Sequence, residues 1–358
     1  MKILAVGAIT NEMNGSSRSF IRLCNLLSRE NEVNVVLPNL DGVADLLIES
    51  INKCIVADIS PIRRSFLNIV KAPFSIVRFY LIVRKIKPDV IHINDIPWFY
   101  LILVAKVSNV PVTIHSRYIE SNRFLKKLIS LFLERADKVI FVSDYNKKLW
   151  NLNRGNKCVT IHNPGVFDFV EMDLSNLRLP KKFALIVSRI SEDKGIIEVI
   201  NSYYKLSKII PDLCLVIAGD YQYNYQKVYK KKCELLVSQL ELDDKVIWLG
   251  KIDKPHSLYK GCAVYYHLPN FEDPFPTTIM EGLSLNSKII TNCKGGIPEQ
   301  VEGFSGVFIL RSTTSSQEVA LFVNDSQTIL DRTTLYKDKF GENAFVRKLT
   351  SVFNKVVE

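Results

Sequence analysis

The stretch LIVSRISEDKGIIEVI, residues 185–200, decides the expected fold, because an apolar run ends in it at Ser188 and a helix begins near Lys194. Apolar runs rich in Val and Ile, without strict alternation of polar and apolar residues, are typical of strands buried on both faces. Such runs alternate with amphipathic stretches of helical length along the whole chain. This alternation predicts an α/β protein whose parallel sheets are covered by helices.

The strands form two series, which predicts two doubly wound, Rossmann-like domains. Strands are expected at 2–7, 32–37, 54–59, 89–94, 111–115, 138–143 and 158–162, and then at 182–188, 213–219, 245–249, 263–268, 287–292 and 306–310. Helices are expected at 17–29, 121–136, 194–208, 223–239 and 333–357. Pro, Asn and Asp collect over 163–181, so we place the domains at 1–165 and 166–337. Open α/β sheets bind ligands at the carboxyl ends of their strands, and two facing sheets predict one central cleft.

The composition excludes several classes of protein. A length of 358 residues, with 47% hydrophobic and 23% charged residues, fits about two globular domains and excludes disorder and collagen. Charges interrupt every apolar run before the roughly 20 residues that a membrane span needs, and residues 1–8 are too short for a signal peptide. The seven cysteines form no C-x-x-C pair, which predicts reduced thiols in a cytosolic protein.

Positive charge is concentrated in the first half of the chain. Residues 1–165 contain 23 lysines and arginines against 13 acidic residues, whereas the second half contains 24 of each kind. So uneven a distribution indicates an anionic partner for the first half alone: nucleic acid, a membrane surface or an acidic substrate.

Arg189 and Lys194 are the first candidate binding residues. Both follow a strand and lie beside a helix N-terminus, where two fixed cations and the positive end of the helix dipole suit a diphosphate. A pair of this kind, taken alone, is more often two solvated loop charges. The neighbouring motifs favour the binding interpretation.

The segment DPFPTTIME, residues 273–281, contains two acids eight positions apart. Asp273 is expected in the loop after a strand, and Glu281 in the following helix, where Pro276 fits the first turn. Both carboxylates can then accept hydrogen bonds from vicinal hydroxyls, such as those of a sugar or ribose. A surface acid plus an acid at the helix dipole is an equally good interpretation of these two residues alone.

Three further positions lie where strands are expected to lead into helices. Gly295 and Gly296 follow the strand at 287–292, and glycines there let a ligand approach backbone N–H groups. Gly15 lies near the start of the first helix, a candidate phosphate cradle. His115 ends a strand and precedes Arg117; a lone histidine in this position is more often structural than catalytic. The chain contains no D-x-D, no P-loop and no G-x-S-x-G, which argues against a P-loop NTPase or an α/β-hydrolase.

Five motifs in this order resemble the GT-B retaining glycosyltransferases of family 4. They are Arg189…Lys194-Gly, Gly219-Asp220, Trp248-Leu-Gly250, Asp273-x7-Glu281 and Gly295-Gly-x-Pro-Glu299. The resemblance covers nearly the whole chain and is most specific over 183–310. It implies a GT-B fold, with an acceptor domain first, a donor domain second and a last helix at about 338–358 that returns to the first domain.

The resemblance also assigns roles to residues. Arg189, Lys194 and Gly15 would bind the diphosphate of a UDP- or GDP-hexose without a metal or another cofactor. Asp273, Glu281 and His115 would be the catalytic residues. Glu281 would hold the ribose, and Asp273 would contact the transferred sugar together with the backbone of Lys294, Gly295, Gly296 and Ile297. Asp273 stands where the family usually has Glu, and the adjacent Glu272 is an alternative for this contact.

The basic half predicts a membrane-facing surface. Arg64, Lys71, Arg78 and Lys85 recur every seven residues, although Pro73 is expected to divide this stretch into two helices. Residues 123–135 combine Arg123, Lys126 and Lys127 with apolar residues, as amphipathic helices on anionic membranes do. The alternative is an ordinary core face with solubilising cations. We expect a peripheral protein at the inner face of the cell membrane, with a lipid-linked or oligosaccharide acceptor in surface polysaccharide or lipopolysaccharide O-antigen assembly.

Other functions remain open at this stage. A nucleotide-sugar epimerase or a phosphorylase is the main alternative enzyme, and a non-catalytic sugar-nucleotide-binding protein is a third candidate. A nucleic-acid binder would need exposed aromatic residues between its cations, whereas Phe66, Phe74 and Phe79 have a core-like spacing. We therefore expect no nucleic-acid partner.

Overall fold

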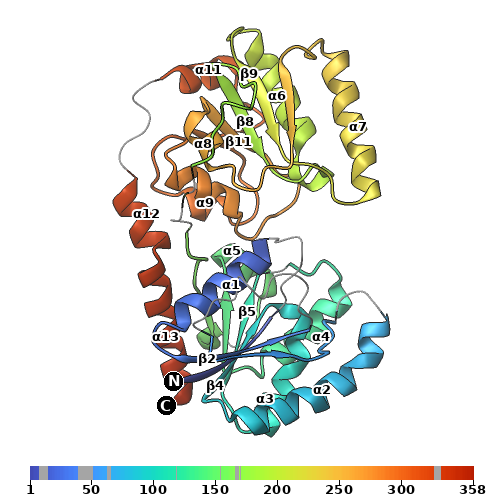
Figure 1. Ribbon diagram of the computed structural model, residues 1–358, viewed down its shortest axis with the longest axis vertical. Coiled ribbons are helices and arrows are strands. Elements are labelled where there is room, and N and C mark those ends of the chain that lie inside the picture. Colours follow the sequence, from blue (N-terminus) through green and yellow to red (C-terminus); the bar gives the residue numbers. More distant parts are fainter. Residues whose placement is uncertain are drawn as a thin grey trace. The chain divides into compact units, whose positions relative to one another are not determined.

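The computed structural model describes residues 1–7, 15–38, 51–62, 66–117, 119–153, 155–165, 169, 171–325 and 332–358. The chain divides into two compact units (Figure 1). Unit 1 contains Met1–Pro164 and Phe340–Glu358, and unit 2 contains Gly165–Lys339.

Unit 1 is built on a seven-stranded parallel sheet. Its strands are β1 (Lys2–Val6), β2 (Glu32–Leu37), β3 (Lys53–Val56), β4 (Val90–Asn94), β5 (Val112–Ser116), β6 (Lys138–Phe141) and β7 (Cys158–Thr160), in the order β3-β2-β1-β4-β5-β6-β7. Its helices are α1 (Gly15–Leu27), α2 (Phe66–Ile86), α3 (Ile102–Val107), α4 (Arg123–Leu133), α5 (Asp144–Trp150) and α13 (Glu342–Val357), with 3-10 turns η2 (Ile96–Leu101) and η3 (Gly155–Lys157).

Helices cover both faces of this sheet, as its strands of continuous Val and Ile require. Successive side chains of β1 point to opposite faces, so Leu4 and Val6 join one core while Ile3 and Ala5 join the other. The first core also contains side chains of α2, α3 and α4, and the second contains those of α1 and α13 (Figure 1). The apolar runs in the sequence are therefore explained by burial on both sides.

Unit 2 repeats this plan with a six-stranded parallel sheet. Its strands are β8 (Phe183–Val187), β9 (Cys214–Ala218), β10 (Val246–Gly250), β11 (Val264–His267), β12 (Ile289–Thr291) and β13 (Val307–Ile309), in the order β10-β9-β8-β11-β12-β13. Its helices are α6 (Ile196–Ser207), α7 (Asn224–Gln239), α8 (His256–Gly261), α9 (Thr277–Ser284), α10 (Ile297–Val301) and α11 (Ser316–Asn324), and the 3-10 turn η4 is Glu192–Lys194. Helix α12 (Thr333–Phe340) connects unit 2 to the last helix. The predicted fold class of two doubly wound parallel sheets is confirmed.

The strand orders show where each unit is built to bind a ligand. In both sheets the direction of winding reverses next to the first strand of the series, between β1 and β4 in unit 1 and between β8 and β11 in unit 2. The carboxyl ends of the two strands at such a switch point leave a crevice for ligands. In unit 2, the loops that leave this point carry Arg189 after β8 and Asp273 after β11.

Pro73 does not divide its helix, so the predicted break is wrong. Helix α2 runs without interruption from Phe66 to Ile86. A proline at this position leaves the carbonyl group of Ile69 without its helical partner. Ile69 is 52% exposed, so this turn of the helix faces solvent, while Phe79 and Val83 bury the opposite face of the helix in the core.

The single closing helix predicted over 333–357 is also wrong. Gly341 has an extended conformation, with a ψ of 144°, and separates α12 from α13. Helix α13 then packs in unit 1, where Phe345 and Leu349 join the core shared with α1 and Glu342 accepts a 2.8 Å hydrogen bond from Arg22.

Candidate functional site

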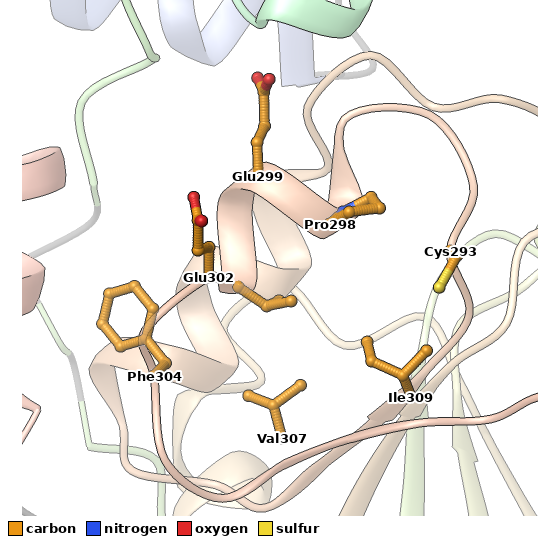
Figure 2. A pocket seen from close by; sticks show the side chains of 8 residues that line it. Cys293, Pro298, Glu299, Glu302, Phe304, Val307 and Ile309 are labelled. Atoms are coloured by element: carbon orange, nitrogen blue, oxygen red, sulfur yellow. The ribbon is translucent and has the colours of Figure 1, made fainter.

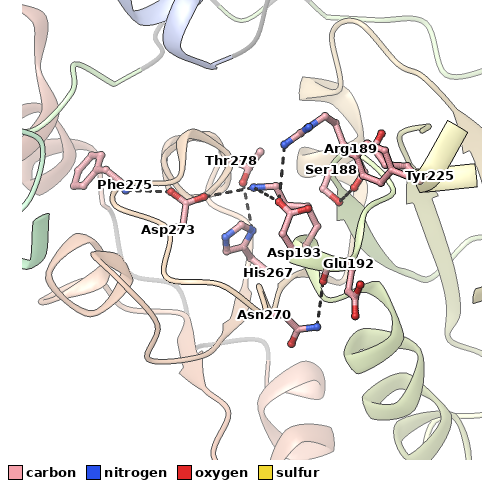
Figure 3. Close-up of polar contacts among 12 residues, drawn as sticks. Ser188, Arg189, Glu192, Asp193, Tyr225, His267, Asn270, Asp273, Phe275 and Thr278 are labelled. Carbon is pink, nitrogen blue, oxygen red and sulfur yellow. Dashed lines mark hydrogen bonds and ion pairs between the residues drawn. The ribbon is translucent and has the colours of Figure 1, made fainter. Parts of the chain in front are cut away.

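Lys194 lies between two carboxylates at the switch point of unit 2. Its Nζ is 3.5 Å from Asp273 Oδ2 and 3.9 Å from Asp193 Oδ2. Arg189 Nη2 approaches the same oxygen of Asp193 at 3.9 Å (Figure 3). The structure therefore brings together three of the predicted residues, Arg189, Lys194 and Asp273, from loops that are 79 residues apart in the chain.

A glycine allows the loop after β8 to lie close to the loop after β11. Gly195 has a φ of +66° and caps the N-terminus of α6. A Cβ atom at this position would lie 1.8 Å from the carbonyl oxygen of Leu268, so no larger residue fits. Asn270 strengthens the same junction, since its backbone N–H donates to Asp193 O at 2.9 Å and its side chain donates to Glu192 O at 3.2 Å. The strand-to-helix turn is thus held directly against the end of β11.

Asp273 is held by its own loop. Its Oδ1 accepts a 3.2 Å hydrogen bond from the N–H of Phe275, which leaves Oδ2 directed at Lys194 (Figure 3). Phe271, two residues earlier, places its ring 4.7 Å from Lys194 Nζ, a cation–π distance. The adjacent Glu272 has a different partner, because its carboxylate accepts a hydrogen bond from the N–H of Gly295.

The glycine turn at 294–297 is seated on the Asp273 loop. Gly295 has a φ of +61°, and a Cβ atom on it would lie 2.0 Å from Asp273 O. The four N–H groups that the sequence predicts as ligand donors all have acceptors within the protein. These are Asn292 Oδ1 for Lys294 at 3.4 Å, Glu272 for Gly295, Asp273 O for Gly296 at 2.9 Å and Lys294 O for Ile297 at 3.2 Å. The side chain of Lys294 is directed at Asn270 O, 2.8 Å away. A ligand that binds these N–H groups must displace the present acceptors.

Glu281 is buried beneath the loops that carry Asp273 and Gly295. It lies in α9, is 7% exposed, and neighbours the hydroxyl groups of Tyr259 and Tyr265. Burial raises the pKa of Tyr259 well above its ordinary value, and the nearby Tyr265 and Glu281 raise it further. Tyr259 is therefore protonated at neutral pH, with its hydroxyl group near the carboxylate of Glu281.

His267 is a residue of this site that the sequence analysis missed. It ends β11, and its Nδ1 lies 3.4 Å from the hydroxyl oxygen of Thr278 (Figure 3). The hydroxyl oxygen of Tyr265 lies 3.3 Å from the same nitrogen. Burial, with a smaller effect of the charge on Lys194, lowers its pKa to about 3. The ring is therefore neutral at pH 7 and adds no positive charge beside Lys194. The sequence did contain a signal for this residue, because His267 lies at the end of the predicted strand that precedes the Asp273 loop.

Unit 1 has a polar cluster at the carboxyl ends of β4 and β5. His115 is fully buried in β5, and burial lowers its pKa well below the usual value, so its ring is neutral. Arg117 follows β5, and its guanidinium donates to Asn163 Oδ1 at 3.1 Å and to Asn94 Oδ1. Gly15 is the first residue of α1. The sequence analysis did not select Asn94, Arg117 or Asn163 as site residues, because their partnership joins the ends of three separate strands.

The predicted membrane cations lie on two helices of unit 1. Lys71 and Arg78 are exposed on α2, Arg123 and Lys127 are exposed on α4, and Lys126 is half-buried. Arg64 lies outside the described residues.

A separate pocket of about 490 Å³ lies between α10 and β13 in unit 2 (Figure 2). Val301, Phe304, Val307 and Ile309 form its apolar lining, and Cys293, Pro298, Glu299 and Glu302 complete it. None of the predicted site residues lines it. Within the described parts of both units, no group of three or more His, Cys, Asp or Glu side chains is placed to hold a metal ion.

Two family models match the chain, one to each part. The model for glycosyl transferases group 1 matches residues 171–344, and the model for Glycosyltransferase Family 4 matches residues 13–165. Together they span nearly the entire sequence.

The curated relatives are also glycosyltransferases. An uncharacterised glycosyltransferase of Methanocaldococcus jannaschii is 28% identical over 259 residues, which are 64% of this chain and 61% of that protein. The N-acetylgalactosamine-N,N'-diacetylbacillosaminyl-diphospho-undecaprenol 4-alpha-N-acetylgalactosaminyltransferase of Campylobacter jejuni is 25% identical over 304 residues, 80% of this chain and 79% of the relative. The chain thus spans about three fifths of the archaeal relative and four fifths of the bacterial one.

Solved structures share the fold at low sequence identity. HepE of Anabaena, in complex with UDP, superposes with a TM-score of 0.82 at 18% identity and covers 99% of this chain and 100% of its own. The lipopolysaccharide outer core galactosyltransferase WaaB, in its apo form, gives a TM-score of 0.73 at 17% identity and covers 99% of each chain.

Proposed function

This chain belongs to the GT-B glycosyltransferases of family 4, and from that premise we propose that it is a retaining, metal-independent enzyme. The donor would be a UDP- or GDP-hexose held by unit 2, and the acceptor a saccharide held by unit 1. The observation that carries this proposal is the convergence of Arg189, Lys194 and Asp273 at the switch point of unit 2.

The charges at this point suit a sugar diphosphate. Lys194 and Arg189 supply two cations beside the N-terminus of α6, whose dipole also favours negative charge. Arg189 is 48% exposed on its side chain and is paired with Asp193 only at 3.9 Å, so it is free to turn toward a phosphate. Asp273 and Asp193 are the counter-charges of Lys194 in this structure, and a diphosphate would compete with them for its ammonium group.

The reaction breaks the bond between the sugar's anomeric carbon and the diphosphate oxygen, and it joins that carbon to the acceptor oxygen on the same face. Negative charge grows on the diphosphate as the bond breaks, and Lys194 and Arg189 would stabilise it from fixed positions. Asp273 and the 294–297 turn would hold hydroxyl groups of the transferred sugar, and Glu281 would hold the ribose. The acceptor proton leaves with the nucleoside diphosphate. The neutral ring of His115 would serve as a hydrogen-bonding group rather than a cation.

For the acceptor, we propose a lipid-linked saccharide in the assembly of a surface polysaccharide such as lipopolysaccharide O-antigen. The name of the Campylobacter relative supports this class, because its acceptor is a saccharide on diphospho-undecaprenol. The enzyme would then act in the cytoplasm as a peripheral protein at the inner face of the membrane. Among the described residues, no helix combines the length and apolar character that a membrane span needs.

A thermal-shift screen tests which nucleotide the protein binds and whether binding needs a metal. The ligands are UDP, GDP, UDP-hexoses and GDP-hexoses, each with and without EDTA. We expect one nucleotide series to raise the melting temperature equally in both conditions, and EDTA-sensitive binding would contradict metal independence. NMR of the product formed on a lipid-linked acceptor should then show retained anomeric configuration. A changed sugar without any transfer would identify the epimerase alternative. Donor binding with neither reaction would identify a binding protein.

A further inference from the structure

Helix α2 presents an apolar stripe to solvent as well as one to the core. Val70, Phe74, Val77 and Leu81 are between 52% and 72% exposed. They are spaced at i, i+4, i+7 and i+11, which places them along one side of the helix. The opposite side, with Phe79 and Val83, is buried against the sheet. The helix is therefore apolar on two sides, and within the described part of the chain only the side with Phe79 and Val83 is covered.

Helix α4 repeats this arrangement. Phe124, Leu128 and Leu131 are 81%, 40% and 49% exposed at i, i+4 and i+7, while Ile129 and Leu133 enter the same core as α2. Helix α3 packs against both α2 and α4 and exposes 74% of Val107. These helices lie on one side of the sheet of unit 1 (Figure 1). We call their exposed surface the α2–α4 face.

The charge on this face has one sign. Helices α2 and α4 contain no acidic residue, and their seven cations are Lys71, Arg78, Arg84, Lys85, Arg123, Lys126 and Lys127. Arg78 lies 3.7 Å from Asp58, but both side chains are more than half exposed, so this pair is weak. The face therefore combines exposed apolar side chains with cations on the same two helices. A solvated helix surface would mix both signs of charge.

We propose that the α2–α4 face docks on an anionic lipid bilayer, with its apolar side chains inserted between the lipids and its cations at the headgroups. Charge complementarity favours this partner, because each cation on the face is attracted to an anionic membrane surface. The apolar side chains can insert into a bilayer, whereas a soluble polyanion would offer them no apolar partner. Nucleic acid would favour stacking aromatics, whereas most of the exposed apolar residues here are Val and Leu.

Because α2 and α4 both bury their other side in the core, they would lie in the plane of the interface rather than cross it. This inference extends the proposed function, since a lipid-linked acceptor is presented at a membrane surface. The biological reason for docking rests on the proposed function, but the binding to lipid does not. Binding to lipid is measured without donor or acceptor.

Co-sedimentation with vesicles tests the proposal. We expect the protein to bind vesicles of phosphatidylcholine with roughly 30 mol% phosphatidylglycerol at least about tenfold more strongly than pure phosphatidylcholine vesicles. The double variant Phe74→Ser/Phe124→Ser should bind the anionic vesicles about tenfold less strongly, a change of about 1.4 kcal/mol. Lys71→Gln/Lys127→Gln should give a similar loss, and high salt should weaken binding of the wild type.

Leu321→Ser in unit 2 is the matched control, because Leu321 is as exposed as Phe74 but lies on α11 near Glu318. It should bind as the wild type does. Equal binding by the Phe74→Ser/Phe124→Ser variant, or no binding of the wild type to anionic vesicles, would overturn the proposal, and so would salt-sensitive capture of nucleic acid in place of lipid. The nucleotide thermal shift, measured on the same samples, checks that each variant is folded. It also separates failure here from failure of the proposed function.

Discussion

Replacing Lys194 by Met removes the central cation of the candidate donor site while it keeps most of the side-chain volume. The ammonium group lies 3.5 Å from Asp273 and 3.9 Å from Asp193, and the side chain is only 17% exposed. A diphosphate placed here gains a charge-assisted hydrogen bond in a partly desolvated position. We therefore expect Lys194→Met to weaken the binding of nucleoside diphosphates strongly and to leave the fold intact.

The size of the loss follows from the strength of such a bond. Hydrogen bonds to charged groups contribute about 1.5–3 kcal/mol, which corresponds to a rise in Kd of roughly 10- to 150-fold. The low exposure of Lys194 favours the upper part of this range, since water screens the charge poorly there. With ligand at about 100 times the wild-type Kd, the wild type gains about 2.7 kcal/mol of stability. A variant that binds about 100-fold more weakly gains only about 0.4 kcal/mol.

Differential scanning fluorimetry with the preferred nucleoside diphosphate measures this difference directly. For a unit of this size, the wild-type Tm should rise by roughly 5–11 °C and that of the variant by about 1 °C. Lys208→Met is the control, because Lys208 is an exposed lysine at the C-terminal end of α6, whereas Lys194 precedes the N-terminus of that helix. A wild-type shift in Lys194→Met would refute the assignment of the diphosphate site, and so would a shift lost equally in Lys208→Met.

Three further predictions address other parts of the molecule. Asp273→Asn should keep the hydrogen bond to the N–H of Phe275 and bind the nucleoside diphosphate, yet lower kcat for transfer at least about tenfold, as steady-state kinetics can measure. Gly195→Ala should destabilise unit 2 by at least about 1 kcal/mol in urea unfolding, because its Cβ would meet Leu268 O at 1.8 Å and its φ is positive. His92 and His267 have pKa values lowered to about 3 in the folded protein, against about 6.5 for an unperturbed side chain. Below pH 6.5 the unfolded chain therefore binds more protons than the folded protein. The contribution of these two histidines to the free energy of unfolding should be constant above pH 7 and fall between pH 6.5 and 3, by up to about 1.4 kcal/mol per pH unit for each histidine. His267→Gln should remove the contribution of His267 to this pH dependence, so the free energy of unfolding of the variant should fall less steeply between pH 6.5 and 3.

Much of the fold could be predicted because buried parallel strands have a strong local signature. Runs such as KILAVG at 2–7 and KFALIVS at 182–188 are apolar on both faces, and the structure places both in the centre of a sheet. Pro73 misled the prediction for a physical reason. The cost of a proline in a helix depends on whether the carbonyl group it frees can reach water, and only the exposure of Ile69 in the folded unit settles that.

The candidate site was predictable where its residues lie next to strand ends. Arg189 lies two residues after the end of β8, and Asp273 lies on the loop after β11, so parallel pairing of these strands brings them to one edge. The cluster around Arg117 was not predictable in this way. Its partners Asn94 and Asn163 are polar residues of ordinary type, and their role depends on which strands are neighbours.

The basic residues of the first half of the chain include two groups with different surroundings in the structure. Arg117 is half-buried at the end of β5, where burial lowers its pKa to about 10 and the nearby Asp95 partly offsets that effect. The cations of α2 and α4 stay at the surface, on the same helices that expose apolar stripes. A surface selected only for solubility has no need of exposed Phe74 or Phe124, and a core selected only for packing has no need of the cations. The proposed docking on a lipid bilayer explains both features together, because such a partner is apolar and anionic at once.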